Sequence, residues 1–186
     1  PSSPTSYLLH LEGIDFHDYI LYDRSIQFLG NVTARIQDLV AVTQRRYERK
    51  RELQHKGGVP DPNGLSPQFQ DLLQALYGLV AMLGEYHHCI FQLVVDGDME
   101  AVPRIQEQAG KIDWYQQQVR TQLQCWETEL IRELDIFSLM SAHRVIFDLE
   151  GIGEALLGLA KTAVRTVGQT LKVEAGEDKI SKKGED

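Results

Sequence analysis

Apolar residues in the second half of the chain, from Asp98 to Val173, recur at steps of three and four. The stretch contains no proline after Pro103. Its repeating positions are Val102, Ile105, Ala109, Ile112, Val119, Leu123, Trp126, Leu130, Leu134 and Phe137, followed by Val145, Leu149, Ile152, Leu156, Leu159, Ala163, Val167 and Leu171. Such spacing places one apolar stripe along a helix and polar residues on the opposite face. The pattern predicts long amphipathic helices whose stripe the upstream residues cover.

Two more helices are predicted before this stretch. The first covers about residues 16–56 and carries the stripe Tyr22, Leu29, Val32, Ile36, Leu39 and Thr43. Residues 57–64, GGVPDPNG, favour turn geometry and end it. Ser66 followed by Pro67 is a start signal for the next helix, because serine caps a helix N-terminus and proline is tolerated at the first helical position. That helix runs to about Val95, and the residues Asp-Gly-Asp at 96–98 end it.

The pattern alone leaves open whether residues 98–173 form one helix or two. Only Ser138 and Ser141 offer turn chemistry between residues 136 and 147, and neither has an acidic residue three places on. A break near 138–144 would give four helices of roughly 40, 30, 40 and 30 residues, which close into an up-down-up-down bundle. An unbroken helix would extend about 110 Å, and its second half could bury its stripe only against the first helix or another chain. We therefore predict an all-α antiparallel bundle of three or four long helices, with four preferred over an elongated three-helix dimer.

The predicted helices form a single domain over residues 15–173. Residues 1–14 contain Pro1 and Pro4 and a short apolar run, and are expected to be a flexible N-terminal segment. From Glu174 the apolar repeat stops and charged residues dominate, which predicts a disordered tail over residues 174–186.

Charge and cysteine usage narrow the function classes. The formal net charge of −8 disfavours a general nucleic-acid binder, because phosphates would repel the chain. Cys89 and Cys125 lie inside apolar helical patterns and are expected to be buried free thiols, which favours a reducing, cytoplasmic location. The most apolar run, residues 72–95, contains Glu85, His87 and His88 and is expected to be a buried helix rather than a membrane span.

Catalytic and cofactor motifs are absent from the sequence. We find no glycine-rich phosphate loop, Cys-x-x-Cys, Gly-x-Ser-x-Gly or His-Glu-x-x-His pattern, and we predict no enzyme activity, cofactor or metal. The two Glu-x-x-His pairs, Glu52 with His55 and Glu85 with His88, would lie about 30 Å apart in a hairpin and could not share a metal ion. The aromatic residues at 114, 115 and 126 are expected to belong to the core rather than to a binding cleft.

Two groups of residues are candidate interaction surfaces. The first is a basic segment at the end of the first helix: Arg45, Arg46, Arg49, Lys50, Arg51 and Lys56. Cations here complement the helix dipole, and they could also dock an acidic partner or an anionic membrane surface. The second is a set of small residues: Gly151, Ala155, Gly158 and Ala163. Glycine costs about 1 kcal/mol in a helix interior, so close packing against another helix is expected. Packing against the first helix is favoured over a self-association face.

These features predict a non-enzymatic helical adaptor or scaffold module that associates through long helix faces with another helical protein or with itself. The alternative is a membrane-surface-binding helical dimer that uses the basic segment near residues 45–56. Its similarity to BAR domains is architectural, and no motif in the sequence carries it.

Overall fold

The computed structural model describes residues 16–54, 65–132 and 135–181, with side chains described at residues 20, 23–50, 52, 65–132 and 135–168. The described residues form four helices and no strand: α2 (Phe16–Gln54), α3 (Pro67–Val95), α4 (Ala101–Arg132) and α5 (Ile136–Ser181). The all-α fold predicted from the sequence is confirmed. Lys56 and the first 14 residues lie outside the described part.

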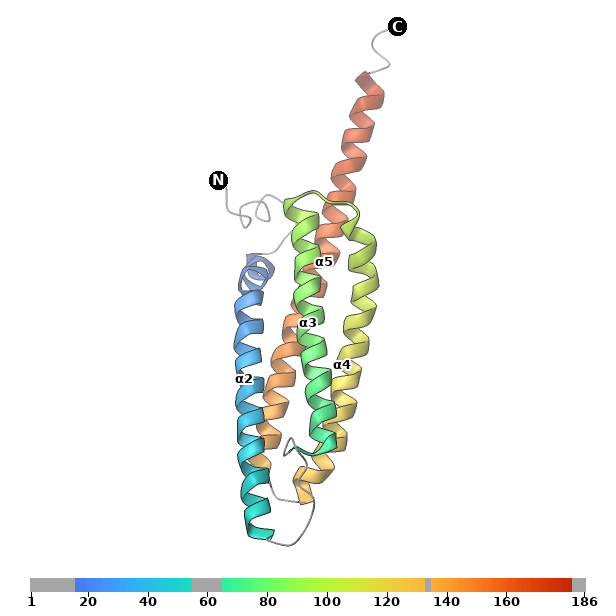
Figure 1. The fold of residues 1–186 in the computed structure, drawn as a ribbon. Helices are drawn as coiled ribbons and strands as arrows, with labels where there is room; N and C mark the ends of the chain where they lie inside the picture. Colours follow the sequence, from blue (N-terminus) through green and yellow to red (C-terminus); the bar gives the residue numbers. More distant parts are fainter. Residues whose placement is uncertain (1–15, 55–64, 133–134, 182–186) are drawn as a thin grey trace.

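The four helices pack side by side in an up-down-up-down bundle (Figure 1). α3 packs most extensively on α4, and α2 on α5, while α2 and α4 lie across the bundle from each other. The preferred four-helix prediction is therefore confirmed, and the alternative with one continuous helix from residue 98 to residue 173 is wrong. Among the described side chains, each helix buries most of its predicted stripe within the same chain.

Both ends of α3 form as the sequence predicts. The hydroxyl of Ser66 accepts a hydrogen bond from the Phe69 amide at 3.3 Å, and Pro67 occupies the first helical position. At the other end the amides of Asp96 and Asp98 both donate to the Gln92 carbonyl, at 3.2 and 3.1 Å. Between those two residues Gly97 has φ +67°, a left-handed conformation that glycine adopts without steric cost. The connection to α4 is therefore a short turn that reverses the direction of the chain.

The break between α4 and α5 lies earlier than predicted. Asp135 caps α5, since its Oδ1 accepts a hydrogen bond from the Ser138 amide at 3.1 Å. The predicted break at residues 138–144 is wrong, because Ser138 and Ser141 already lie inside α5. The prediction rested on residues after Ile136, whereas the capping carboxylate lies one residue before it.

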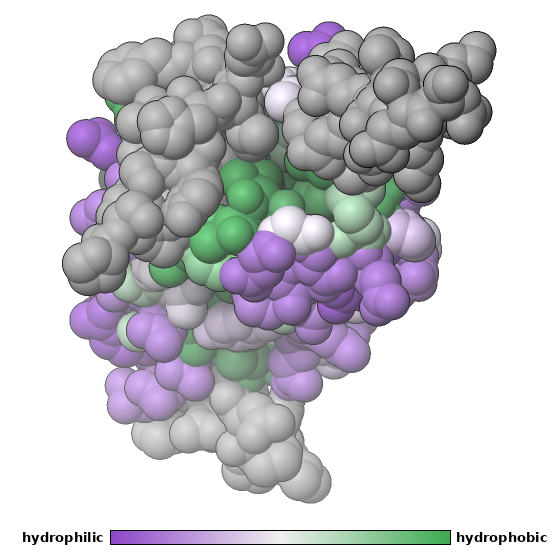
Figure 2. All heavy atoms as spheres, turned by 90° about the horizontal axis from the view of Figure 1, so that it is seen from above, coloured by the Kyte–Doolittle hydropathy of each residue, from purple (hydrophilic) through white to green (hydrophobic). Residues whose placement is uncertain are grey.

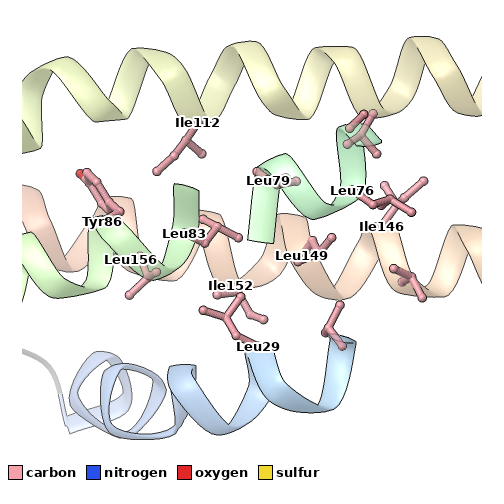
Figure 3. Close-up of a cluster of buried hydrophobic side chains, with 14 of the residues drawn as sticks. Leu29, Leu76, Leu79, Leu83, Tyr86, Ile112, Ile146, Leu149, Ile152 and Leu156 are labelled. Atoms are coloured by element: carbon pink, nitrogen blue, oxygen red, sulfur yellow. The ribbon is translucent and has the colours of Figure 1, made fainter. Parts of the chain in front are cut away.

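The core is built from all four helices. Figure 3 shows apolar side chains converging on the bundle axis from each of them, and its labelled residues are Leu29, Leu76, Leu79, Leu83, Tyr86, Ile112, Ile146, Leu149, Ile152 and Leu156. Trp126 is fully buried, as expected, with its ring centroid 4.5 Å from that of Phe69. In the end-on view of Figure 2, hydrophobic residues gather toward the middle of the described atoms and hydrophilic residues lie at the flanks.

α5 continues beyond the bundle. Its backbone is helical to Ser181, and Figure 1 shows its last turns projecting past the ends of α3 and α4. The tail predicted from Glu174 thus begins as helix in the structure. Glutamate, alanine and lysine are good helix formers, so this segment can stay helical without an apolar stripe. Residues 182–186 lie outside the described part.

Candidate interaction surface

α5 carries a second line of residues, directly opposite its buried one. We call it the outer stripe, and it follows the steps three, four, three, four along the helix: Phe137, Met140, Arg144, Phe147, Gly151, Glu154, Gly158 and Lys161. All eight positions are exposed. The core residues Ala142, Val145, Leu149 and Ile152 occupy the opposite face of the same turns. α5 is therefore apolar on two faces over its first four turns.

The large side chains of the outer stripe leave much apolar surface in solvent. Phe137 is 85% exposed, Phe147 75% and Met140 64%. Together they present on the order of 400 Å² of apolar surface, as much as the largest patch on a typical monomer, and such patches are often functional. The prediction that Phe137 lies on the inward stripe is wrong, and the exposure of Met140 and Phe147 was not predicted. A count of apolar residues on both faces of α5 could have found them.

Open grooves run between the outer stripe and α2. One groove of about 400 Å³ is lined on the α5 side by Phe147, Gly151 and Ala155, and on the α2 side by Phe28 and Asn31. A second groove, of about 410 Å³, lies toward the start of α5. Phe137 and Arg144 line it on the α5 side, and Asp38 and Val42 line it on the α2 side. Arg35 lines both grooves. The two grooves therefore follow one another along α2 and α5, and Arg35 lies where they meet.

Ion pairs tie α5 to its neighbours on both sides of the outer stripe. On the α2 side Arg35 pairs with Asp148. On the α4 side Arg120 Nε donates to Glu150 Oε1 at 2.7 Å, and this hydrogen bond raises the pKa of Arg120. These pairs are largely exposed and contribute little to stability. Their effect on the surface is a polar rim around an apolar line, the arrangement that protein interfaces share.

The four small residues predicted as a packing face divide between two environments. Ala163 is buried in the core, and Ala155 is half-buried in the groove. Gly151 and Gly158 are exposed, and a Cβ added to either would meet nothing within 4 Å. The expectation that these two glycines pack against the first helix is therefore wrong. The glycine that does allow close packing is Gly153, where a Cβ would lie 2.7 Å from Gln116 Nε2 on α4.

The predicted basic segment is divided in a similar way. Arg46 pairs with Asp135, the residue that caps α5, and both side chains are mostly buried. Arg45 and Arg49 are exposed, although Arg45 Nε donates to the Ala41 carbonyl of its own helix at 3.2 Å. Lys50 is half-buried. The side chain of Arg51 and the whole of Lys56 lie outside the described residues. Part of the segment therefore fastens α2 to the α4–α5 turn.

A tyrosine strengthens that attachment. The Tyr47 hydroxyl donates to the carboxylate of Glu129 on α4. Burial, together with this bond, raises the pKa of Tyr47 to about 12, because the ionised phenolate would be poorly solvated and would face a negative charge.

The remaining candidate residues are scattered. Cys89 is buried and burial raises the pKa of its thiol, whereas Cys125 is exposed, so the expectation that both are buried is wrong for Cys125; both thiols are free. Trp114 is largely exposed and stacks edge-on against Tyr115, with ring centroids 4.9 Å apart, so it does not belong to the core. Among the described side chains, no three His, Cys, Asp or Glu groups are placed to hold a metal ion.

One described helix, α3, is long and apolar enough by composition to cross a membrane. A helix at the centre of a bundle meets the same criterion, and α3 buries a full line of side chains from Phe69 to Leu93 against the other helices.

Comparison with models of protein families, with curated proteins and with solved structures finds no match to this chain. The interaction surface must therefore be interpreted from its own chemistry.

Proposed function

We propose that the chain is a non-enzymatic adaptor or scaffold module that binds a helical protein along the outer stripe of α5. The observation that carries this proposal is the line of exposed Phe137, Met140 and Phe147 beside the α2–α5 grooves. An amphipathic helix laid into such a depression would insert apolar side chains at spacings of three and four residues. The free thiols support a reducing, cytoplasmic setting for this role.

Energetics support the same surface. Burying a phenylalanine side chain that is otherwise exposed contributes about 1.5–3 kcal/mol. Phe137 and Phe147 lie ten residues apart on one helix, about 15 Å, so one docked helix of four turns could cover both. Aromatic anchors at the centre of a polar rim are the residues that usually dominate binding energy.

The test replaces both anchors with serine. A double variant carrying Phe137→Ser and Phe147→Ser should fold normally, because neither side chain is buried, and should lose the stoichiometric helical partner that the unmodified chain retains. The matched control is Trp114→Ser, which removes an exposed aromatic side chain from α4. Quantitative affinity capture from cell extract, with chemical cross-linking to locate the contact, provides the measurement. Equal retention of every partner by the double variant would contradict the proposal.

A second candidate function uses the basic segment. The exposed guanidinium groups of Arg45 and Arg49 support docking to an anionic membrane surface. Each basic residue near such a surface contributes about 1 kcal/mol, so these two give weak binding by themselves, and this function ranks second. Sedimentation with phosphatidylserine vesicles tests it. Binding that disappears with Arg45→Glu and Arg49→Glu, and with high salt, would support it, and unchanged sedimentation of the variant would exclude it.

A further inference from the structure

The outer stripe has two unlike halves. Its first half carries large side chains, Phe137, Met140 and Phe147, and one cation, Arg144. Its second half carries two glycines and an anion: Gly151, Glu154 and Gly158, before Lys161. Arg144 and Glu154 are both exposed, and among the described residues neither forms a close ion pair, although the charge of Glu154 contributes to the raised pKa of Arg120. Large side chains and a positive charge on one half therefore match open space and a negative charge on the other.

This match becomes specific when two copies of α5 are placed antiparallel. With a two-fold axis at the level of Leu149, Phe147 of one copy faces Gly151 of the other, and Arg144 faces Glu154. In the next layer Met140 faces Gly158. Every contact occurs twice, as a symmetric dimer interface requires. Steps of three and four are also the spacing at which two helices interdigitate over a long contact.

Other arrangements of two copies are disfavoured by the same residues. A parallel pair places Phe147 on Phe147, Arg144 on Arg144 and Glu154 on Glu154. An antiparallel pair centred on Arg144 again brings its two guanidinium groups together, and like charges in contact oppose association. The antiparallel register about Leu149 pairs Phe147 and Met140 with glycines and Arg144 with Glu154, and it places Phe137 opposite Lys161 at each end.

The two glycines give an independent reason. Each lowers the stability of α5 relative to alanine, and neither is required by packing inside the bundle, since a Cβ at either position would meet nothing within 4 Å. Close approach of a second helix would use the space that they leave. From Phe137 to Lys161 the stripe extends about 36 Å, enough length for an interface of standard size once the flanking helices contribute.

We infer that the partner of the outer stripe is a second copy of this chain, bound as an antiparallel α5–α5 dimer. This inference rests on the proposed function and names its partner. The polar rim on either side of each α5 would then lie at the edges of the dimer.

Charge reversal tests the register. Arg144→Glu and Glu154→Arg should each weaken dimerisation by about tenfold, because two attractive pairs become repulsive in each variant. The double variant should return to the affinity of the unmodified chain, because the pair is restored with its signs exchanged. Sedimentation equilibrium of the full chain measures this, and circular dichroism verifies the fold of each variant. A double variant that is as weak as either single variant would overturn the register.

Cysteine cross-linking tests the direction. In a Cys125→Ser background, which removes the exposed thiol, a chain with Arg144→Cys mixed with a chain with Glu154→Cys should form a disulfide-linked dimer on oxidation. Either chain alone should form none, since an antiparallel pair separates identical positions by ten residues, about 15 Å along the axis. Efficient cross-linking of the Arg144→Cys chain by itself would show a parallel dimer and overturn the inference.

The outcome also separates this inference from the proposed function. A chain that remains monomeric at the highest concentration measured, yet binds a different helical protein in a manner that Phe137→Ser and Phe147→Ser abolish, overturns the dimer and leaves the adaptor function standing. A chain that dimerises equally well with and without Phe137 and Phe147 overturns both.

Discussion

The two helix pairs that pack most extensively are α3 with α4 and α2 with α5. They differ in how much apolar surface they leave exposed to solvent. α3 and α4 are joined by a short turn, and the Tyr115 ring lies so close to α3 that a Cβ at Gly78 would be 2.5 Å from its Cε1 atom. The exposed Trp114 stacks on that ring. α2 and α5 are distant in sequence, enclose open grooves and expose two phenylalanines.

This difference separates the requirements of folding from those of association. The α3–α4 side also has an open groove, of about 540 Å³, but its aromatic side chains, Trp114 and Tyr115, contact each other. On the α2–α5 side the core is equally closed, but a second apolar line remains beyond what the core needs. Exposed apolar patches of this size are often interaction sites, which is why we propose that another helix covers this one.

The largest expected effect on stability distinguishes a core residue from a residue of the outer stripe. Leu79→Ala, at a fully buried position of α3, should lower the free energy of unfolding by about 3 kcal/mol through lost transfer energy and the cavity left behind. Phe147→Ser should change it by less than about 0.5 kcal/mol. Urea unfolding of the Arg144→Glu variant, at a protein concentration well below its dimer Kd, measures both. A loss at Phe147 as large as that at Leu79 would mean that the stripe serves the fold.

The next effect concerns the joint that holds α2 to α5. Asp135→Ala should cost about 2 kcal/mol, because it removes both the cap of α5 and the partner of Arg46. Asp135→Asn keeps a capping side chain and should cost less, and Asp113→Ala, at an exposed site on α4, serves as the control. If alanine and asparagine were equally costly at position 135, the ion pair alone would account for the effect.

Stability at alkaline pH should depend on the buried Tyr86 of α3. Burial raises the pKa of Tyr86 to about 12, so the folded state holds a phenolic proton that the unfolded chain loses near pH 10. This contribution is fully present below pH 10 and is lost as pH rises toward 12, where stability should fall by about 2 kcal/mol from this residue. Tyr86→Phe should flatten the fall, as measured by urea unfolding at each pH. An unchanged slope would contradict the assignment.

The smallest expected effects on stability come from two glycines, Gly78 at the α3–α4 contact and Gly158 on the outer stripe of α5. Gly78→Ala should destabilise the chain by about 1 kcal/mol, since the Tyr115 ring must move. Gly158→Ala should stabilise it by up to about 1 kcal/mol, because alanine favours the helix and its methyl group meets open space. Thermal unfolding in the Arg144→Glu background, at the same low protein concentration, compares them. The same Gly158→Ala change should weaken the dimer when Arg144 is present, so a simultaneous gain in both would contradict the proposed interface.

The all-α bundle and most helix ends could be predicted from the sequence, four helices were preferred over three only narrowly, and the interaction surface could not be predicted. Periodicity identifies a helix, and local groups such as the hydroxyl of Ser66 or the left-handed Gly97 identify where it starts and stops. Asp135 was missed because its capping role depends on where the preceding helix ends, which periodicity across residues 98–173 does not show.

Choosing which of two apolar faces turns inward requires tertiary information. On α5 the inward line through Leu149 and the outward line through Phe147 are both apolar, and Phe137 was assigned to the wrong one. Similarly, Cys125 is adjacent in sequence to the buried Trp126, but one residue along a helix rotates a side chain by about 100°, far enough to leave the thiol in solvent. Glycines that pack closely, such as Gly153, are indistinguishable from exposed ones until the neighbouring helices are placed.

The composition of α3 has a consequence for how the chain is made. This helix is the most apolar of the four, and it leaves the ribosome before α4 and α5. For a few seconds at ordinary translation speeds, only α2 is available to cover its hydrophobic face. The short turn at Gly97 delivers α4 to that surface as soon as it is synthesised, and hairpins closed by nearby residues form quickly. We therefore expect nascent chains truncated at residue 98 to bind chaperones or aggregate, and chains that extend through Arg132 to be protected.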